Sequence, residues 1–155
     1  MVDISSIRSE LSAPHPVTGA YSPSDEAAAA ELNAKNVPKL VPIPSSELLA
    51  WSAQASTGGR PRKLKIDEAA TAHLSEAVKA VAQAAQTMIE RDSTSLDLSQ
   101  TDRAAMVEAL VAGGVLTTAD KDSLYAAATV MVSRADELGI GRVRVGDVAR
   151  ARSQN

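Results

Sequence analysis

The sequence contains no cysteine and no phenylalanine, and only 2% of its residues are aromatic. Without cysteine the chain can form no disulfide, no thiolate metal site and no cysteine nucleophile. Alanine supplies much of the 45% hydrophobic share. Because apolar burial contributes only about 25 cal/mol per Å² and alanine buries little area, we expect a thin core that neighbouring subunits help to stabilise.

Long apolar runs are also missing. No stretch approaches the roughly 20 apolar residues that a membrane span needs. The opening MVDISSIRSELSAPHP lacks the basic region and apolar run of a signal peptide. We therefore expect a soluble protein that is made in the cytoplasm and has no membrane partner.

The sequence has few of the signatures of catalysis. It contains two histidines. His73 and Glu76 have the i, i+3 spacing of a ligand pair in a helical bundle, but such metal sites use paired motifs and no second one occurs. There is no G-x-S-x-G motif to supply a serine nucleophile, and no glycine-rich loop is followed by Lys-Ser or Lys-Thr. We expect no enzymatic activity, no cofactor and no metal.

Charge is unevenly distributed along the chain, whose net charge is −3. Residues 1–59 carry −3, residues 60–65 carry +4, residues 66–138 carry −7 and residues 139–155 carry +3. Two short basic segments thus interrupt an acidic chain. We predict that their side chains, together with Trp51, are interaction residues. The basic residues are Arg60, Arg62, Lys63 and Lys65 in the first segment, and Arg142, Arg144, Arg150 and Arg152 in the second.

Apolar periodicity and capping signals predict short helices in the first part of the chain. Ser22 and Pro23 have the types preferred at the N-cap and first position of a helix. Prolines at 38, 42 and 44 remove backbone donors, which favours an extended, polyproline-like arm over a central strand. The expected elements are a helix over 3–13, a helix from Ser22 to about Asn36, the arm over 37–46, a helix over 45–56, and a loop at 58–65 carrying the first basic segment.

Longer helices are predicted in the second part. Leu74, Val78, Val81, Ala85 and Met88 step by 4, 3, 4 and 3 residues, which indicates one apolar seam along a helix. The same stepping recurs from Leu124 to Leu138, and both seams favour packing in a bundle. The expected elements are a helix over 67–91, a helix from a Ser99–Asp102 capping box to Gly113, a helix from a Thr117–Asp120 capping box to Gly139, and a strand-like RVRV followed by one or two helical turns.

These elements predict a mainly α fold, a small helical bundle with an extended proline-rich arm and a short basic C-terminal β/α tip. We place the division between residues 1–65, with the first helices and the arm, and residues 66–155, with the bundle and the tip.

Two features leave alternatives open. The stretch AMVEALVAGGVLTTADKDSLYAAATV is helix, glycine turn, helix, which fits either a simple αα-hairpin or a DNA-binding helix-turn-helix. Its second helix would meet phosphates with net negative charge, which disfavours sequence-specific nucleic-acid binding. The residues in that position are Thr118, Asp120, Lys121 and Asp122. The basic C-terminal segment either binds the acidic surface of a neighbouring subunit or only balances charge within its own chain.

Several stretches resemble small proteins encoded among the virion genes of tailed bacteriophages. They are HPVTGAY, AAAAELNAKN, VSRADELGIG and VGDVARARS, at the start and in the last third of the chain. No catalytic residue is carried over with this resemblance. It implies a structural protein of the virion, a head–tail connector or adaptor or a tail component, made in the host cytoplasm and binding itself as a homo-oligomer and other virion proteins. The alternative is a small cytoplasmic assembly helper or nucleic-acid-binding regulator.

Overall fold

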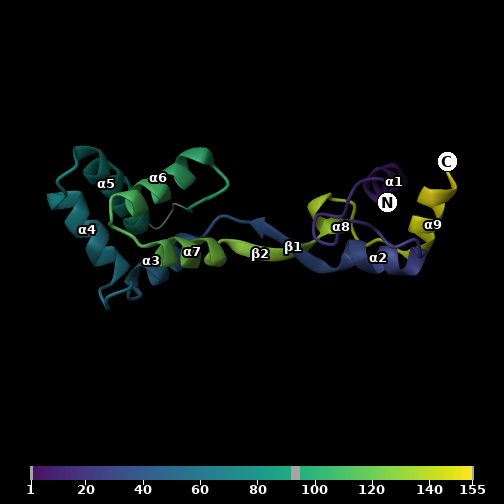
Figure 1. Ribbon diagram of the computed structural model, residues 1–155, viewed down its shortest axis with the longest axis horizontal. Helices are drawn as coiled ribbons and strands as arrows, with labels where there is room; N and C mark the ends of the chain where they lie inside the picture. Colours follow the sequence, from purple (N-terminus) through teal and green to yellow (C-terminus); the bar gives the residue numbers. More distant parts are fainter. Residues whose placement is uncertain (1, 92–94, 155) are drawn as a thin grey trace. The chain divides into compact units, whose positions relative to one another are not determined.

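The computed structural model describes residues 2–91 and 95–154, and the chain is mainly helical, as predicted (Figure 1). Its contacts define two compact units. Unit 1 combines Met1–Lys39 with Val130–Asn155, and unit 2 is Leu40–Thr129. This grouping differs from the predicted division at residue 65, because the first and last segments of the chain pack against each other.

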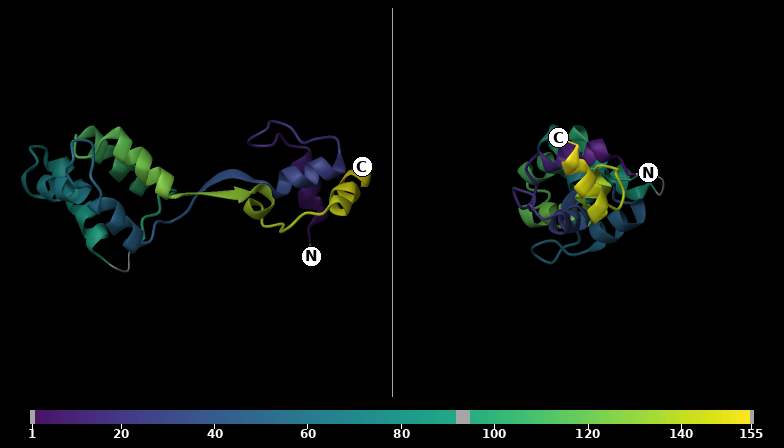
Figure 2. Two further views of the ribbon diagram at one scale, coloured as in Figure 1. Left: turned by 90° about the horizontal axis from the view of Figure 1, so that it is seen from below. Right: turned by 90° about the vertical axis from the view of Figure 1, so that its right-hand side faces the viewer.

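Unit 1 is built from helices at both ends of the chain. They are α1 (Ile4–Leu11), α2 (Asp25–Asn33), α8 (Arg134–Glu137) and α9 (Val145–Ser153). Helix α9 packs against α1 and α2, and Figure 2 shows the purple N-terminal helix close to the yellow C-terminal one. Ile7, Leu32 and Val148 are fully buried in their shared core. Burial of one such side chain stabilises a fold by about 1.5–3 kcal/mol, so the C-terminal helix is an integral part of unit 1 rather than a loose tip.

The chain passes from unit 1 into unit 2 along one strand and returns along another, and the two strands pair in an antiparallel sheet (Figure 1). Its strands are β1 (Lys35–Leu40) and β2 (Thr129–Ser133). The single helix predicted over 117–138 is therefore confirmed only in part, because it ends at Ala127 and the β-branched residues of TVMVS form a strand before the short helix α8. Part of the predicted arm is strand as well. Pro38 is tolerated because both strands of a two-stranded sheet are edge strands.

Unit 2 is a group of helices packed around α5. They are α3 (Ser45–Ala53), α4 (Arg62–Ala72), α5 (Glu76–Glu90), α6 (Thr101–Ala112) and α7 (Thr118–Ala127). Helix α5 contacts α3, α4 and α6, and α6 contacts α7. Trp51, Ile66, Leu110 and Leu124 are buried in the core. The helix predicted over 45–56 is confirmed in this form, whereas Arg62 begins a helix rather than lying in the predicted loop.

The single helix predicted over 67–91 is in fact two helices. Helix α4 ends at Ala72 with His73 as its C-cap, and Ser75 caps α5 by accepting a hydrogen bond from Val78 N–H. The His73 ring stabilises the break, because its Nδ1 accepts from Ser75 N–H and its Nε2 lies 3.1 Å from Gly113 O. Leu74, the first residue of the predicted seam, is fully exposed. A serine able to cap a new helix competes here with continuation of the old one.

The capping signals have mixed outcomes. The Thr117–Asp120 box is confirmed with both reciprocal hydrogen bonds, and Gly139, with a φ of 68°, ends α8 as expected. Helix α2, however, is capped by Ser24. The predicted cap, Ser22, instead donates its backbone N–H to Glu31 Oε2 at 2.9 Å.

Two further sequence predictions fail near helix starts. Gln100, not Ser99, occupies the N-cap of α6, because the Ser99 hydroxyl donates to Asp97 Oδ1 at 2.6 Å. The RVRV segment forms no strand among the described residues, and its last valine already belongs to α9. The predicted β/α tip is thus a loop followed by a helix.

Candidate functional site, an arginine pocket on unit 1

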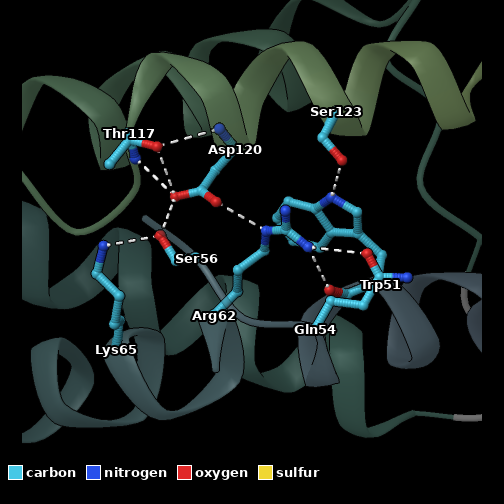
Figure 3. Close-up of polar contacts among 8 residues, drawn as sticks. All are labelled: Trp51, Gln54, Ser56, Arg62, Lys65, Thr117, Asp120 and Ser123. Carbon is cyan, nitrogen blue, oxygen red and sulfur yellow. Dashed lines mark hydrogen bonds and ion pairs between the residues drawn. The ribbon is translucent and has the colours of Figure 1, made fainter. Parts of the chain in front are cut away.

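Arg62, from the first basic segment, is buried in unit 2 rather than available on its surface. Its Nε donates to Asp120 Oδ1 at 2.8 Å, and one terminal nitrogen donates to Trp51 O at 2.9 Å and to Gln54 Oε1 at 3.2 Å (Figure 3). The guanidinium also lies 4.7 Å from the centre of the Trp51 ring, within cation–π range. Arg62 and Trp51 were both predicted to be interaction residues, but they interact with each other inside the chain.

Asp120 is the acceptor at the centre of this network (Figure 3). Besides Arg62, it accepts from the Ser56 hydroxyl at 2.6 Å and from the backbone N–H and hydroxyl of Thr117, both at 2.9 Å. Burial acts to raise the pKa of Asp120, but the hydrogen bonds from Ser56, Thr117 and Arg62 outweigh it and lower this pKa to about 2. The network therefore holds a charged carboxylate and a charged guanidinium against each other in the interior.

The other cations of the first basic segment have polar partners on the surface of unit 2. The partners are Glu68 for Arg60, Asp67 and Glu90 for Lys63, and Ser56 for Lys65. A cavity of about 400 Å³ next to them is lined by Arg60, Lys65 and His73. Arg60 is paired with Glu68, whereas Lys65 donates only to the neutral hydroxyl of Ser56 and keeps an uncompensated positive charge at this cavity.

Arg152, from the second basic segment, clamps α9 onto the chain before α2. Its guanidinium donates to the carbonyl oxygens of Ser22 and Pro23 and to Asp25 Oδ1 at 2.6 Å. For this arginine the structure agrees with the alternative in which the basic residues act within their own chain. Its contacts tie the end of unit 1 to its N-terminal half.

The remaining arginines of the second basic segment line an open pocket. Arg142, Arg144 and Arg150 are exposed, and their guanidinium groups form no hydrogen bond or ion pair with the described residues. With Val2, Ile4 and Asp147 they surround a cavity of about 360 Å³, which we call the arginine pocket. A second cavity of about 390 Å³ shares Arg142 and Arg144 and extends to Glu26 and Val145.

The backbone beneath the arginine pocket is held by α2. The Asn33 side chain donates to Val143 O at 2.7 Å and accepts from Val143 N–H at 3.0 Å. Val143 is buried, so its neighbours Arg142 and Arg144 project from a fixed segment. Asp147 adds a cap by accepting from Arg144 N–H at 3.0 Å. Such preorganisation reduces the ordering cost of binding.

The chemistry of the arginine pocket suits an acidic polypeptide. Guanidinium groups match carboxylates in a bidentate geometry, and Val2 and Ile4 add apolar surface for an aliphatic stem. No aromatic ring lines the pocket to stack a nucleic-acid base. Among the described residues there is also no cluster of three or more His, Asp and Glu side chains that could hold a metal ion.

A further polar cluster in unit 1 was not found from the sequence. Glu10 is bound by Arg134 in a bidentate geometry, at 2.8 and 2.9 Å, and accepts the Tyr21 hydroxyl at 2.6 Å. The hydrogen bond from Arg134 is the main reason why the pKa of Glu10 is lowered. Next to it, buried His15 lies edge-on to Tyr21. These contacts join α1 to α8 across 124 residues, a separation that no local pattern indicates.

The helix–turn–helix of α6 and α7 has the features of an αα-hairpin. Asp120 is buried in the network of Figure 3, and Lys121 is paired with Glu108 at 3.0 Å. The first turn of α7 therefore presents no unpaired cation to a DNA backbone, in contrast to the basic surface that phosphate binding requires.

Comparison with known proteins identifies no relative of this chain. No protein-family model matches the sequence, and no curated protein or solved structure is significantly similar to it. In residues 2–91 and 95–154, no helix has the length and apolar character needed to cross a membrane.

Proposed function

We propose that this protein is a non-enzymatic structural protein of a tailed bacteriophage particle, at the head–tail connection or in the tail, and that it acts by protein–protein assembly. The observation that carries the proposal is the arginine pocket, where Arg142, Arg144 and Arg150 remain without ion partners among the described residues. The resemblance of HPVTGAY and VSRADELGIG to virion-encoded proteins supports the phage setting.

Electrostatics favours a protein partner for the arginine pocket. Most other arginines and lysines of the described chain have a carboxylate or carbonyl partner, as Arg62 and Arg152 do. A partner carboxylate would add charge-assisted hydrogen bonds, which are stronger than neutral ones. Complementary charge of this kind mainly sets orientation and association rate, as the ordered addition of subunits to a particle requires.

Exposed apolar side chains provide further contact area. Val145, beside the arginine pocket, is 47% exposed, and Met131 of β2 is 52% exposed. Arginine with aliphatic side chains is the composition of a protein interface rather than of a nucleic-acid groove. The runner-up, a cytoplasmic helper or regulator that contacts nucleic acid, is supported by the same arginines but lacks aromatic residues at the pocket.

Quantitative mass spectrometry of purified phage particles tests the proposal. We expect the protein to be present at a fixed number of copies per particle. The double variant that combines Arg144→Glu with Arg150→Glu should be incorporated at a lower level than the wild-type protein. The matched control is Arg8→Glu, which reverses an exposed arginine on α1 outside the arginine pocket. Absence of the wild-type protein from intact particles contradicts the proposal.

A further inference from the structure

The two-stranded sheet leaves the outer edge of β2 open. Its strands pair only with each other among the described residues, so each strand has one edge without a partner (Figure 1). Val41 N–H donates to Ala128 O at 2.7 Å. Because backbone groups along an antiparallel ladder alternate in direction, continuation from this bond turns the N–H and C=O of Met131 away from β1. Within residues 2–91 and 95–154, no backbone hydrogen bond from outside the sheet engages Met131, so its donor and acceptor remain available.

The outer edge of β1 is protected against further pairing, whereas that of β2 is not. The same register places Pro38 opposite Met131, with its ring nitrogen on the outer edge of β1, where it can donate no hydrogen bond. Lys35 and Lys39 add positive charge to β1, and both are exposed. The sequence of β2, TVMVS, contains no charge and no proline. Charges and prolines are devices by which edge strands avoid pairing with another chain, so β2 is the edge suited to accept a further strand.

Side chains on both faces of β2 are exposed. Successive residues of a strand point to opposite faces, and Val130 is 40% exposed and Met131 52%. A strand added at this edge would therefore cover apolar surface on both faces of the sheet. This combination is typical of β-strand addition, where backbone hydrogen bonds supply affinity and the side chains fix the register.

The sequence of β2 fits a second copy of itself. Read in the two directions, TVMVS and SVMVT differ only by the exchange of threonine and serine. An antiparallel pair centred on Met131 places this residue opposite its copy. On either side Val130 faces Val132, and at the ends Thr129 faces Ser133. Apolar side chains thus meet apolar ones, hydroxyls meet hydroxyls, and no charges are opposed. Because the backbone groups of Met131 face outward, the two central residues form a hydrogen-bonded pair that exchanges both N–H···O bonds.

We infer that β2 of one copy pairs antiparallel with β2 of a second copy, across a two-fold axis at Met131, to form a four-stranded sheet. The contact is isologous, since both copies use the same surface, and it closes as a dimer. The inference rests on the proposed function for the role of the contact, and it deepens that function by naming a second copy as one partner in assembly. It uses none of the residues that line the arginine pocket.

Disulfide trapping tests this pairing directly, because the chain contains no cysteine. Met131→Cys places a single thiol of each copy at the proposed axis. The two Cα atoms of a hydrogen-bonded pair are about 5.5 Å apart, within the range of about 4.4–6.8 Å that a disulfide spans. Val17→Cys is the matched control, since Val17 also lies in unit 1 and is also 52% exposed. Under mild oxidation, Met131→Cys should form covalent dimer about tenfold faster than the control or more, because pairing holds its two thiols at high effective concentration.

Two charge variants test the two-fold axis without disulfide formation. Met131→Lys and Met131→Glu each place like charges opposite each other, so each should weaken self-association about tenfold or more. An equal mixture of the two variants should recover the association in sedimentation equilibrium, because the new lysine of one copy then faces the new glutamate of the other. Circular dichroism should show both variants folded, since the side chain at this position is exposed. Val17→Lys is the control and should leave the association unchanged.

The inference is overturned if the wild-type protein stays monomeric at high concentration, or if Met131→Cys crosslinks no faster than Val17→Cys. It is also overturned if the mixed charge variants associate no better than either alone, or if Met131→Lys leaves a dimer intact, since the contact then lies elsewhere. The proposed function is judged separately, because it depends on the presence of the protein in particles. Particles that contain the protein retain that function even if its copies do not pair through β2.

Discussion

Replacement of Asp120 by asparagine should strongly destabilise unit 2. The change keeps the side-chain shape but removes the charge that pairs with buried Arg62, whose Nε lies 2.8 Å from Asp120 Oδ1. The Asp120 side chain is only 2% exposed and the Arg62 side chain 9%, so solvent screens the pair little. Removing one partner of a buried ion pair typically costs about 3–5 kcal/mol, a large share of the stability of a small domain.

The pH dependence gives a second measure of the same interaction. The pKa of Asp120 is lowered to about 2 from its usual 3.8. A lowered pKa means that the charged form stabilises the fold above pH 4, and that about 2 kcal/mol is lost as the pH falls from 4 to 2. The asparagine variant cannot titrate at this position and should lack this part of the acid sensitivity.

Fluorescence of Trp51 during urea unfolding measures this effect, because Trp51 is the single tryptophan of the chain and lies in the core of unit 2. Asp122→Asn is the matched control, an exposed site on the same helix, where we expect a change within about 0.5 kcal/mol. If the Asp120 variant does not fold, Ser56→Ala removes the hydrogen bond to Asp120 and the longer one from Lys65, and should cost about 1–2 kcal/mol. A loss below about 1 kcal/mol for Asp120→Asn, or unchanged acid sensitivity, would refute the reasoning.

Three further substitutions test other contacts. Arg152→Met keeps the aliphatic stem but removes the clamp on α2, and should increase amide hydrogen exchange in α9, with a loss of about 1–2 kcal/mol. His15→Ala leaves two backbone N–H groups without the Nδ1 acceptor and should destabilise unit 1 more than His15→Asn, whose Oδ1 can replace it; equal hydrogen exchange in both would contradict this role. Gly113→Ala places a Cβ 2.7 Å from Val78 Cγ1 and should cost about 1–3 kcal/mol in urea unfolding, whereas Gly146→Ala, with open space at its Cβ, should not.

The local signals in the sequence predicted several element ends correctly. The Thr117–Asp120 box and Gly139 were found because a helix cap depends on residues within one turn of each other. The first alanine-containing seam is largely confirmed, because Ala85 and Met88 of α5 are buried and Val78 and Val81 pack against the core. Its expected start at Leu74 was wrong, and the second seam was misleading because a strand interrupts it after Ala128. A 4-3-4-3 pattern ignores a local stop, and Ser75 provides one.

The strand at 129–133 had a usable signal in its run of β-branched residues, but the periodicity of the flanking segments masked it. The long-range pairings of side chains had no such signal in the sequence. Arg62 and Asp120 are 58 residues apart, and nothing in the local sequence marks them as partners. For the arginine pocket, the sequence prediction named the whole basic segment and could not separate Arg152, which is clamped, from Arg150, which is exposed.

The passage of the chain through β1 and β2 makes unit 2 an insertion within unit 1. Its two ends are closed by a hydrogen bond from Val41 N–H to Ala128 O at 2.7 Å. During synthesis, unit 2 is therefore complete before the ribosome has made α9. The N-terminal helices must wait for Val148 and Ala151 to cover their apolar faces. Unit 1 therefore finishes folding after unit 2, and the arginine pocket forms only once α9 has been made.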